Sequence, residues 1–425
     1  MSCAHGSRSA RTTIRQMAVS GGGGLIRLIR LIRRITWGFV VAGLLLACGV
    51  VASAGTQSYR GDDFWCLRTA GQLVLERRDP YDADTWAATA AAPVPLPNGQ
   101  VAKSTCTGTA FAYPLWTALG MVPFAMLPPD ASATVWIAVS VGAVAWGAFW
   151  CWSAFGGAAR SALLCAVLVA FSQPLWLVVR AGQTTAIELG LLGLTAWSLA
   201  RGRERSAGAA FASLALKPQL VLLAWPLLLA EAARRGRRPF LLAAVVSGAA
   251  GALISLVVAP SWPIEWLQAV FGPRLRIAAL LPTAWGLAND TLGSPAWGAV
   301  LVIALVLVLA ALLHGVAVDR VALLALGVSV SLFASPHVWS YDHLLLVLPW
   351  AATLAIGASA GPRGHRPLII GVVLVASLLP WVAWAVALAR LSETHAAAVP
   401  ALSALLLAFA LRVRGSPGRQ QENRL

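Results

Sequence analysis

The chain has 425 residues, of which 59% are hydrophobic and 11% are charged, and its mean hydropathy is +0.75. So apolar a composition cannot cover a water-exposed surface, which excludes a soluble multidomain protein and indicates an all-α polytopic membrane protein. The net charge of +16 does not indicate a nucleic-acid partner, because the arginines fall in short clusters between apolar runs, where they set membrane topology.

The N-terminal part of the chain is expected to precede a membrane domain. Residues 1–34 are polar, Gly-rich and basic, and we predict a disordered cytoplasmic segment there. The apolar run at about 36–54 is long enough to span a bilayer. It ends in VASAG, which also suits signal-peptide cleavage, but further spans follow and favour an uncleaved anchor. We therefore expect an integral membrane domain at 35–412 and a cytoplasmic tail at 413–425.

A pair of carboxylates opens the first predicted outer loop, residues 55–131. Asp62 and Asp63 stand directly before an amphipathic stretch, which predicts a helix lying on the outer leaflet and ending at DPYD. One of the two aspartates can act as a general base that removes a proton from a hydroxyl. The alternative is helix capping, because Asp is favoured at a helix start. The residues alone leave both interpretations open.

Six cysteines without a CxxC pair argue against a structural zinc or redox site, and no metal is expected. Cys66 and Cys106 both lie in the 55–131 loop, which we place outside the cytoplasm, where disulfides persist. A bridge between them is one interpretation. Two small buried side chains are the other.

Apolar runs of about twenty residues predict the later spans. They lie at about 132–154, 161–179, 239–259, 294–313, 367–386 and 396–412. Placing the arginine-bearing hinges in the cytoplasm satisfies the positive-inside rule. With shorter segments between the runs, this gives about 12 transmembrane helical segments, both termini in the cytoplasm, and a second outer loop at 260–293.

The segment 207–230 lies between two arginine clusters, so it should enter the membrane and return to the same side. Its roughly 24 residues cover about 36 Å as helix, which suits two half-length helices with a turn at Lys217 and Pro218. The Pro-broken stretch 111–128 is likewise not an ordinary crossing. Such short helices leave a cavity in the membrane that a lipid-linked substrate can use. The alternative for 207–230 is a single straight crossing, with one arginine cluster outside.

Lys217 is unusual because the chain has 30 arginines but only two lysines, and this one stands in an apolar segment. A buried ammonium needs an anion, which predicts contact with the phosphate of a lipid-linked donor. The alternative is a lysine that extends to the membrane boundary. Arg180 and Gln183 share a predicted outer turn, and the amide suits sugar hydroxyls or a phosphate. A plain helix boundary is the other interpretation of this turn.

Three further polar or aromatic stretches are predicted on the same side. They are FAYPLW with Tyr113, SPHVWSYDH with His337 and His343, and FGPRLR with Arg274 and Arg276. The histidines lack metal-ligand spacing, which favours structural histidines. The two arginines depart from the positive-inside pattern and either bind a phosphate or form an ordinary solvated loop pair.

Taken in order, several of these stretches resemble glycosyltransferase family 87, membrane-embedded enzymes of the GT-C type. The resemblance rests on DFWCLRTAGQLVLERRDPYD, FAYPLW, the GQ turn, LALKPQL and SPHVW, and covers residues 35–349. It implies a GT-C-type fold with some half-length helices and with interfacial helices in a large first periplasmic loop. It also implies inverting transfer of a hexosyl group from a polyprenyl-phosphate sugar to a hydroxyl of a glycan or glycolipid. The expected group is mannosyl, in an α-1,2-like linkage, with no cofactor.

The resemblance also assigns roles to residues. Asp63 aligns best with the catalytic aspartate of the family, and Asp62 is the contender. Lys217, Gln183 and His337 match positions near the donor phosphate and sugar. The implied site faces the periplasm in a bacterial-type cytoplasmic membrane. The QTT after Gly182 departs from the usual family version, so transfer of arabinofuranose or glucose stays open.

A transporter or flippase is the alternative from another functional class. It predicts ionisable residues at mid-depth in the membrane and an internal repeat. Here acidic residues gather in the first outer loop and no repeat is evident, which favours an enzyme. The expected partners are a lipid-linked sugar, its acceptor and membrane lipid, and no nucleic acid.

Overall fold

A computed structural model gives the structure of most of the chain. It describes residues 62–90, 94–95, 101–102, 111–156, 159–271, 273–359 and 361–415. All of them belong to one compact unit, Cys48–Leu425. Regular structure in these residues is helical except for one short pairing of β1 (Val94–Pro95) with β2 (Val101–Ala102), in agreement with the all-α prediction. The predicted N-terminal segment and first span lie outside the described residues, as do 416–425.

Six helices in the described chain are long and apolar enough to cross a membrane, so the protein is membrane-embedded. They contain α5 (Pro129–Ala154), α11 (Arg238–Val258), α14 (Gly298–Leu313), α16 (Val347–Ser359), α17 (Gly361–Val373) with α18 (Leu379–Arg390), and α19 (Ala398–Gly415). Five of them coincide with predicted runs. The sixth, Ser340–Ala358, includes η5 (Ser340–Leu346) and α16, and it was not predicted because its first residues are polar and lower its hydropathy. The total of about 12 segments stays a prediction.

The predicted run at 161–179 forms two helices, α6 (Ala159–Ala170) and α7 (Gln173–Ala181). The segments Leu163–Ala170 and Gln173–Ala181 are bent by 52° relative to each other. Ser172 causes the break, because its side chain accepts a hydrogen bond from Leu175 N and so starts a new helix. Pro174 follows in the first turn of α7, where its missing N–H costs nothing. The bend directs α7 toward the turn that carries Gln183.

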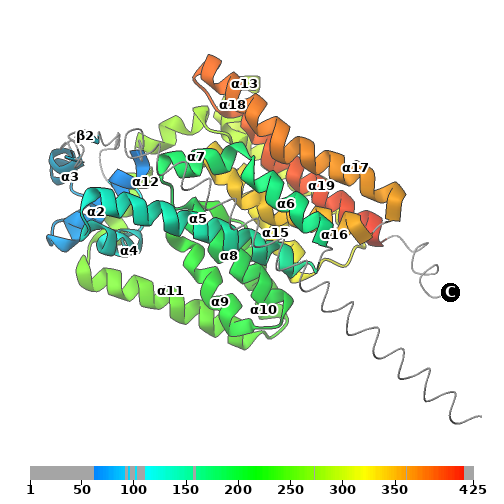
Figure 1. The fold of residues 1–425 in the computed structure, drawn as a ribbon, viewed down its shortest axis with the longest axis horizontal. Coiled ribbons are helices and arrows are strands. Elements are labelled where there is room, and N and C mark those ends of the chain that lie inside the picture. Colours follow the sequence, from blue (N-terminus) through cyan, green and yellow to red (C-terminus); the bar gives the residue numbers. More distant parts are fainter. Residues whose placement is uncertain are drawn as a thin grey trace, which may run out of the picture. The chain divides into compact units, whose positions relative to one another are not determined.

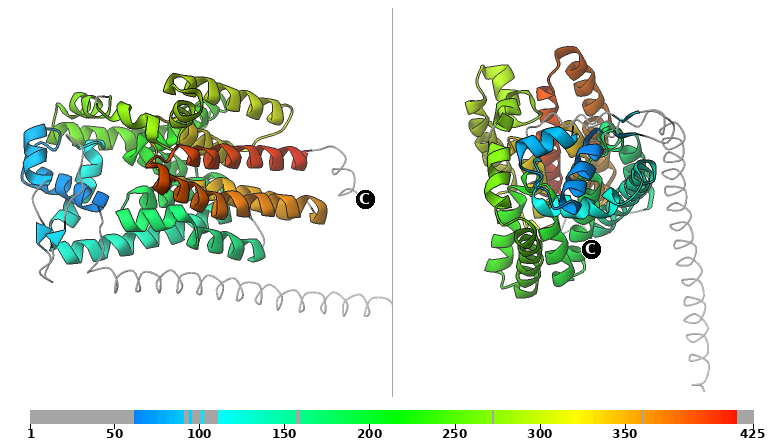
Figure 2. Two further views of the ribbon diagram at one scale, coloured as in Figure 1. Left: turned by 90° about the horizontal axis from the view of Figure 1, so that it is seen from above. Right: turned by 90° about the vertical axis from the view of Figure 1, so that its left-hand side faces the viewer.

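Four short helices lie at one end of the bundle, where α2 and α3 appear in blue (Figure 2): α2 (Asp62–Leu75), α3 (Ala83–Ala90), α4 (Leu115–Ala125) and α12 (Trp262–Phe271). Three more, η3 (Pro273–Leu280), α13 (Ala284–Leu292) and η4 (Pro295–Trp297), follow α12 in the chain and lead to α14. Arg68 ties α2 to α4, because it donates to Leu127 O at 3.0 Å and to Ala125 O at 3.3 Å. Cys66 is disulfide-bonded, whereas Cys106, its predicted partner, lies outside the described residues.

The segment 207–230 forms two short helices that go out and come back. Its elements are α9 (Glu204–Ser213), η1 (Leu214–Leu216), η2 (Pro218–Val221) and α10 (Ala224–Arg234), which we call the broken hairpin. Arg320, at the start of α15 (Arg320–Ala334), pairs with Glu204 at 2.7 Å and with Glu231 at 2.8 Å. Both ends of the broken hairpin therefore meet one side chain. The predicted turn at Lys217 is confirmed, and a straight crossing is wrong.

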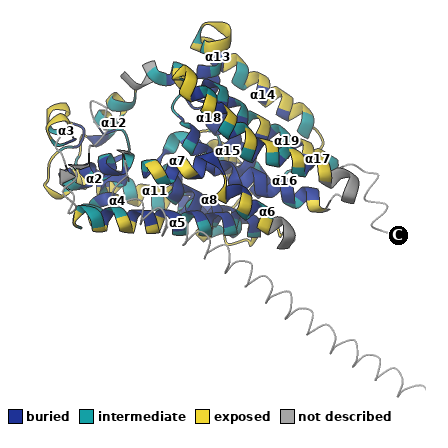
Figure 3. Cartoon of the chain, turned by 45° about the horizontal axis from the view of Figure 1, so that its top comes forward, coloured by how far each residue is buried: buried dark blue, intermediate teal, exposed yellow. Residues whose placement is uncertain are grey.

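Burial, coloured in Figure 3, separates the central helices of the fold in Figure 1 from the peripheral ones. In the Ser340–Ala358 helix, 83% of an apolar 18-residue stretch is buried inside the protein, whereas in α11 only 11% of such a stretch is buried. A helix that is apolar all round and largely unburied faces hydrocarbon, so α11 borders the bilayer. It packs most extensively on α9, where a Cβ on Gly208 would clash with the carbonyl oxygen of Phe240. Only glycine allows these two helices to approach so closely.

Candidate active site

Gln183 occupies a turn between α7 and α8 (Thr185–Ala200). Gly182 ends α7 with a φ of 73°, a left-handed conformation that glycine adopts without steric cost. Trp136 Nε1 of α5 donates to Gly182 O at 2.9 Å and fixes the turn against that span. The Gln183 side chain is only 1% exposed, so its amide is held in the interior.

Lys217 lies at the break of the broken hairpin, between η1 and η2. Helix α4 holds this break, because Trp116 Nε1 donates to Ala215 O at 3.0 Å and Thr117 Oγ1 donates to Leu216 O at 3.2 Å. The Lys217 side chain is 3% exposed. A Pro-interrupted segment clamped by a neighbouring helix thus places an ammonium in the interior.

The Lys217 ammonium donates to three acceptors among the described residues. These are Asp342 Oδ1 at 2.8 Å, Gln183 Oε1 at 3.1 Å and Thr185 Oγ1 at 3.4 Å. An ammonium has three N–H groups, so its donors are fully used. A ligand anion can bind Lys217 only by displacing one of these acceptors.

Asp342 is the counter-ion of this group, and it is 1% exposed. Its Oδ1 also accepts from Thr185 Oγ1 at 2.6 Å, and its Oδ2 accepts from Trp339 N at 3.0 Å. Burying an ion pair is costly unless further hydrogen bonds satisfy both charges, and here both carry such bonds. We call Gln183, Thr185, Lys217 and Asp342 the Lys217 cluster.

Two tyrosines border the Lys217 cluster. Gln183 Nε2 donates to Tyr341 Oη at 3.0 Å, and Tyr113 Oη donates to Gln183 Oε1 at 3.3 Å. Lys217 Nζ lies 4.8 Å from the centre of the Tyr341 ring. Burial raises the pKa of Tyr113, opposed by Lys217 and reinforced by Asp63, so its hydroxyl remains a hydrogen-bond donor.

The Lys217 cluster opens into a cavity of about 370 Å³, which we call the site cavity. Its polar wall includes Tyr113, Lys217, His337, Tyr341 and Asp342. Apolar and aromatic side chains form the rest, among them Trp225, Trp266, Val270, Phe271 and Trp339. A buried cation beside a few polar groups in an apolar cavity suits a ligand with both an anionic and an apolar part.

The family model of glycosyltransferase family 87 matches residues 111–336, more than half of the chain. The chain belongs to glycosyltransferase family 87. Membership indicates a glycosyltransferase, an enzyme that moves a sugar from a donor to an acceptor. No curated protein matches the chain significantly. Tyr113, Gln183 and Lys217 lie within the matched residues, whereas Asp63 precedes them and Asp342 follows them.

The remaining predicted residues of this family 87 enzyme occupy different places. His337 lines the site cavity. Asp63 is half-buried at the second position of α2, and its charge acts on Tyr113. Asp62 is the first residue of that helix. Arg180 is exposed, and its guanidinium stacks 4.9 Å from the centre of the Trp176 ring; neither residue lines the site cavity.

Arg274 and Arg276 belong to η3, but their side chains lie outside the described residues. His343 is fully buried beside Asp342 in sequence. No group of three His, Cys, Asp or Glu side chains with the arrangement of a metal site occurs in the described part of the chain.

Sequence reasoning missed Thr185, Tyr341 and Asp342, although it had singled out the two stretches that contain them. A signal for Asp342 existed, because a lysine in an apolar segment needs a carboxylate, and Asp342 is the one carboxylate of SPHVWSYDH. Glu188 was missed as well. It is 1% exposed and accepts a hydrogen bond from Thr184 Oγ1 at 3.2 Å, on the helix that carries Thr185.

Proposed function

We propose that this glycosyltransferase transfers a mannosyl group from a polyprenyl-phosphate sugar to a hydroxyl of a glycan or glycolipid acceptor. The observation that carries the proposal is the buried Lys217 ammonium in the wall of an otherwise largely apolar cavity. A cation at such depth suits a phosphate, and the apolar walls suit a lipid-linked donor. The donor is a substrate, and the reaction as proposed uses neither a cofactor nor a metal ion.

Lys217 binds the donor phosphate by exchanging one of its acceptors. The bonds to Gln183 and Thr185 are longer than the 2.8 Å contact with Asp342 and involve neutral oxygens, so they are the weaker ones. The phosphate displaces one of them, while Asp342 keeps the ammonium in place. The compact head and flexible stem of a lysine suit such an exchange.

Asp63 acts as the general base. It takes the proton of the acceptor hydroxyl as that oxygen attacks the anomeric carbon of the donor sugar. The bond from this carbon to the phosphate oxygen breaks, and polyprenyl phosphate leaves with the electron pair. Attack opposite the leaving group inverts the anomeric configuration. The reaction takes place at the outer face of a bacterial-type cytoplasmic membrane, with both termini in the cytoplasm and Arg274 and Arg276 as further donor contacts.

Replacement of the base tests this function. Asp63→Asn should lower the rate of sugar transfer by about a thousandfold, because it removes general-base catalysis. Labelled transfer from undecaprenyl-phosphate mannose is measured in proteoliposomes, and gel filtration in detergent checks that each variant is folded. Asp84→Asn, an exposed carboxylate on the neighbouring α3, is the matched control and should leave the rate unchanged.

The two aspartates are separated by comparing their variants. Loss in Asp62→Asn with full activity in Asp63→Asn assigns the base to Asp62. Full activity in both contradicts a catalytic role for this pair. The donor is tested in the same assay, in which mannosyl transfer should exceed transfer from the glucosyl and arabinofuranosyl donors.

A further inference from the structure

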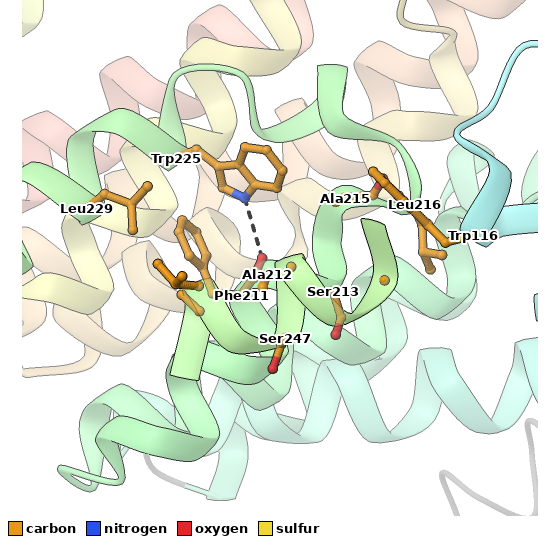
Figure 4. Close-up of a pocket in the computed structure, with 13 residues that line it drawn as sticks. Trp116, Phe211, Ala212, Ser213, Ala215, Leu216, Trp225, Leu229 and Ser247 are labelled. Carbon is orange, nitrogen blue, oxygen red and sulfur yellow. Dashed lines mark hydrogen bonds between the residues drawn. The ribbon is translucent and has the colours of Figure 1, made fainter. Parts of the chain in front are cut away.

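A second cavity, of about 420 Å³, lies on the flank of the broken hairpin, between this hairpin and α11 (Figure 4). Residues of α4, α9, η1, α10 and α11 line it. Its walls are hydrocarbon for the most part, including Phe211, Leu216, Leu229 and Val245. We call it the flank cavity.

Four polar side chains occur in the lining of the flank cavity, and three of them are already bonded within the protein. Trp225 Nε1 donates to Phe211 O at 3.4 Å, the dashed contact in Figure 4. Trp116 Nε1 donates to Ala215 O at 3.0 Å, and Ser213 Oγ donates to Ala209 O at 3.0 Å. Ser247 is the fourth. Because three of its four polar side chains are already hydrogen-bonded, this wall offers few groups to a sugar or a phosphate. It is better suited to a hydrocarbon chain.

The flank cavity adjoins the site cavity. Trp225 lines both of them, and the consecutive residues Leu216 and Lys217 line the flank cavity and the site cavity respectively. One ligand can therefore hold its anionic group at Lys217 and pass a chain around Trp225. Because α11 borders the bilayer, the far side of the flank cavity is open to lipid.

We propose that the flank cavity binds isoprene units of the donor's polyprenyl chain and selects for long-chain donors. The inference rests on the proposed function, because that function supplies a ligand with a phosphate and a chain together. Gly248 and Gly251 of α11 keep the cavity open. A Cβ at either position would meet no atom within 4 Å, so the space beside both glycines is unfilled by protein.

A leucine at Gly248 tests the proposal because it fills this space without a clash. Helix propensity also favours Leu over Gly, so the variant should fold. Gly142→Leu on α5 is the matched control, because a Cβ there likewise meets nothing within 4 Å and the residue lines neither cavity. KM and kcat are measured with undecaprenyl-phosphate mannose and with a donor carrying a single prenyl unit.

Gly248→Leu should raise KM for the undecaprenyl donor about tenfold, equivalent to about 1.4 kcal/mol of lost binding. Its KM for the prenyl donor, its kcat and all constants of Gly142→Leu should stay unchanged. An equal rise in KM for both donors, or no rise for either, overturns the assignment.

A binding measurement keeps the inference separate from the proposed function. Undecaprenyl phosphate should raise the melting temperature of the unaltered protein and of Gly142→Leu, and should do so much less for Gly248→Leu. If this pattern holds but no sugar is transferred, the flank cavity stands and the proposed function fails. If dodecyl phosphate gives the same Gly248-dependent shift, the cavity takes any hydrocarbon chain, and the isoprenoid assignment is wrong.

Discussion

The open ends of the broken hairpin and its turn each carry ion pairs, but the pairs are built differently. At the open ends of the hairpin, Arg320 makes bonds of 2.7 and 2.8 Å to the two oxygens of Glu204, and it also pairs with Glu231 at 2.8 Å. At the turn, Lys217 shares its three donors between Asp342 and two neutral oxygens. Arg320 lines neither the site cavity nor the flank cavity, whereas Lys217 lines the site cavity.

This difference indicates what each end does. A guanidinium that lies between two carboxylates from different helices suits joining α9, α10 and α15. A lysine with two weak neutral acceptors can exchange them for a ligand. The same hairpin is thus locked at its open ends and ready for exchange at its turn.

The largest expected effect is on activity, at the turn. The neutral pair Lys217→Met with Asp342→Asn should lower kcat/KM for transfer by about a thousandfold, because the donor phosphate loses its cationic contact. Replacing both partners avoids leaving a buried unpaired charge, so the melting temperature should change little. Transfer assays and thermal denaturation in detergent measure the two quantities. Full activity in this variant contradicts a donor contact at Lys217.

The second expected effect is on stability, at the open ends. Arg320→Met should lower the free energy of unfolding by about 2 kcal/mol, because the buried Glu231 and the part-buried Glu204 each lose one ion-pair partner. KM for the donor should stay unchanged. Arg235→Met is the matched control, since this exposed arginine pairs with Glu231 at 3.0 Å at the C-terminal end of α10 and should cost at most about 0.5 kcal/mol. A higher KM in Arg320→Met without loss of stability removes the distinction between the two ends.

The smallest expected effect is at the border of the Lys217 cluster. Tyr113→Phe removes one hydrogen bond to Gln183 and should cost about 1 kcal/mol of stability. Burial raises the pKa of Tyr113, so its hydroxyl is protonated at neutral pH and this cost should be the same from pH 6 to pH 8, as chemical denaturation at several values can measure. A cost that falls steeply as pH rises in this range means that the tyrosine ionises and that its environment is more polar than described.

Much of the fold could be predicted from the sequence. Five of the spanning helices followed from apolar runs, since a membrane helix needs about twenty such residues. The break at Lys217 followed from Pro218 and from arginine clusters on both flanks. The bend before α7 was missed. It depends on Ser172, whose side chain caps the new helix, and on Pro174 in the first turn, and these two residues barely change the hydropathy of the run.

The candidate site was predictable only in part. Gln183 and Lys217 stood out as residues, and Tyr113 as part of an aromatic stretch, but nothing local placed them together. Asp342 pairs with Lys217 across 125 positions of the chain, and the polar start of its helix concealed it in the hydropathy pattern.

The sequence by itself determined a membrane-embedded chain, its family and a hairpin that turns at a lysine. These depend on composition, on motif order and on local signals such as proline and charge, which a linear pattern carries. Only the tertiary structure decided which acceptors use up the Lys217 donors, and that Trp225 stands between two cavities. Those facts depend on how α4, α8, α11 and η5 pack around the hairpin, and packing between distant helices leaves no periodic trace in the sequence.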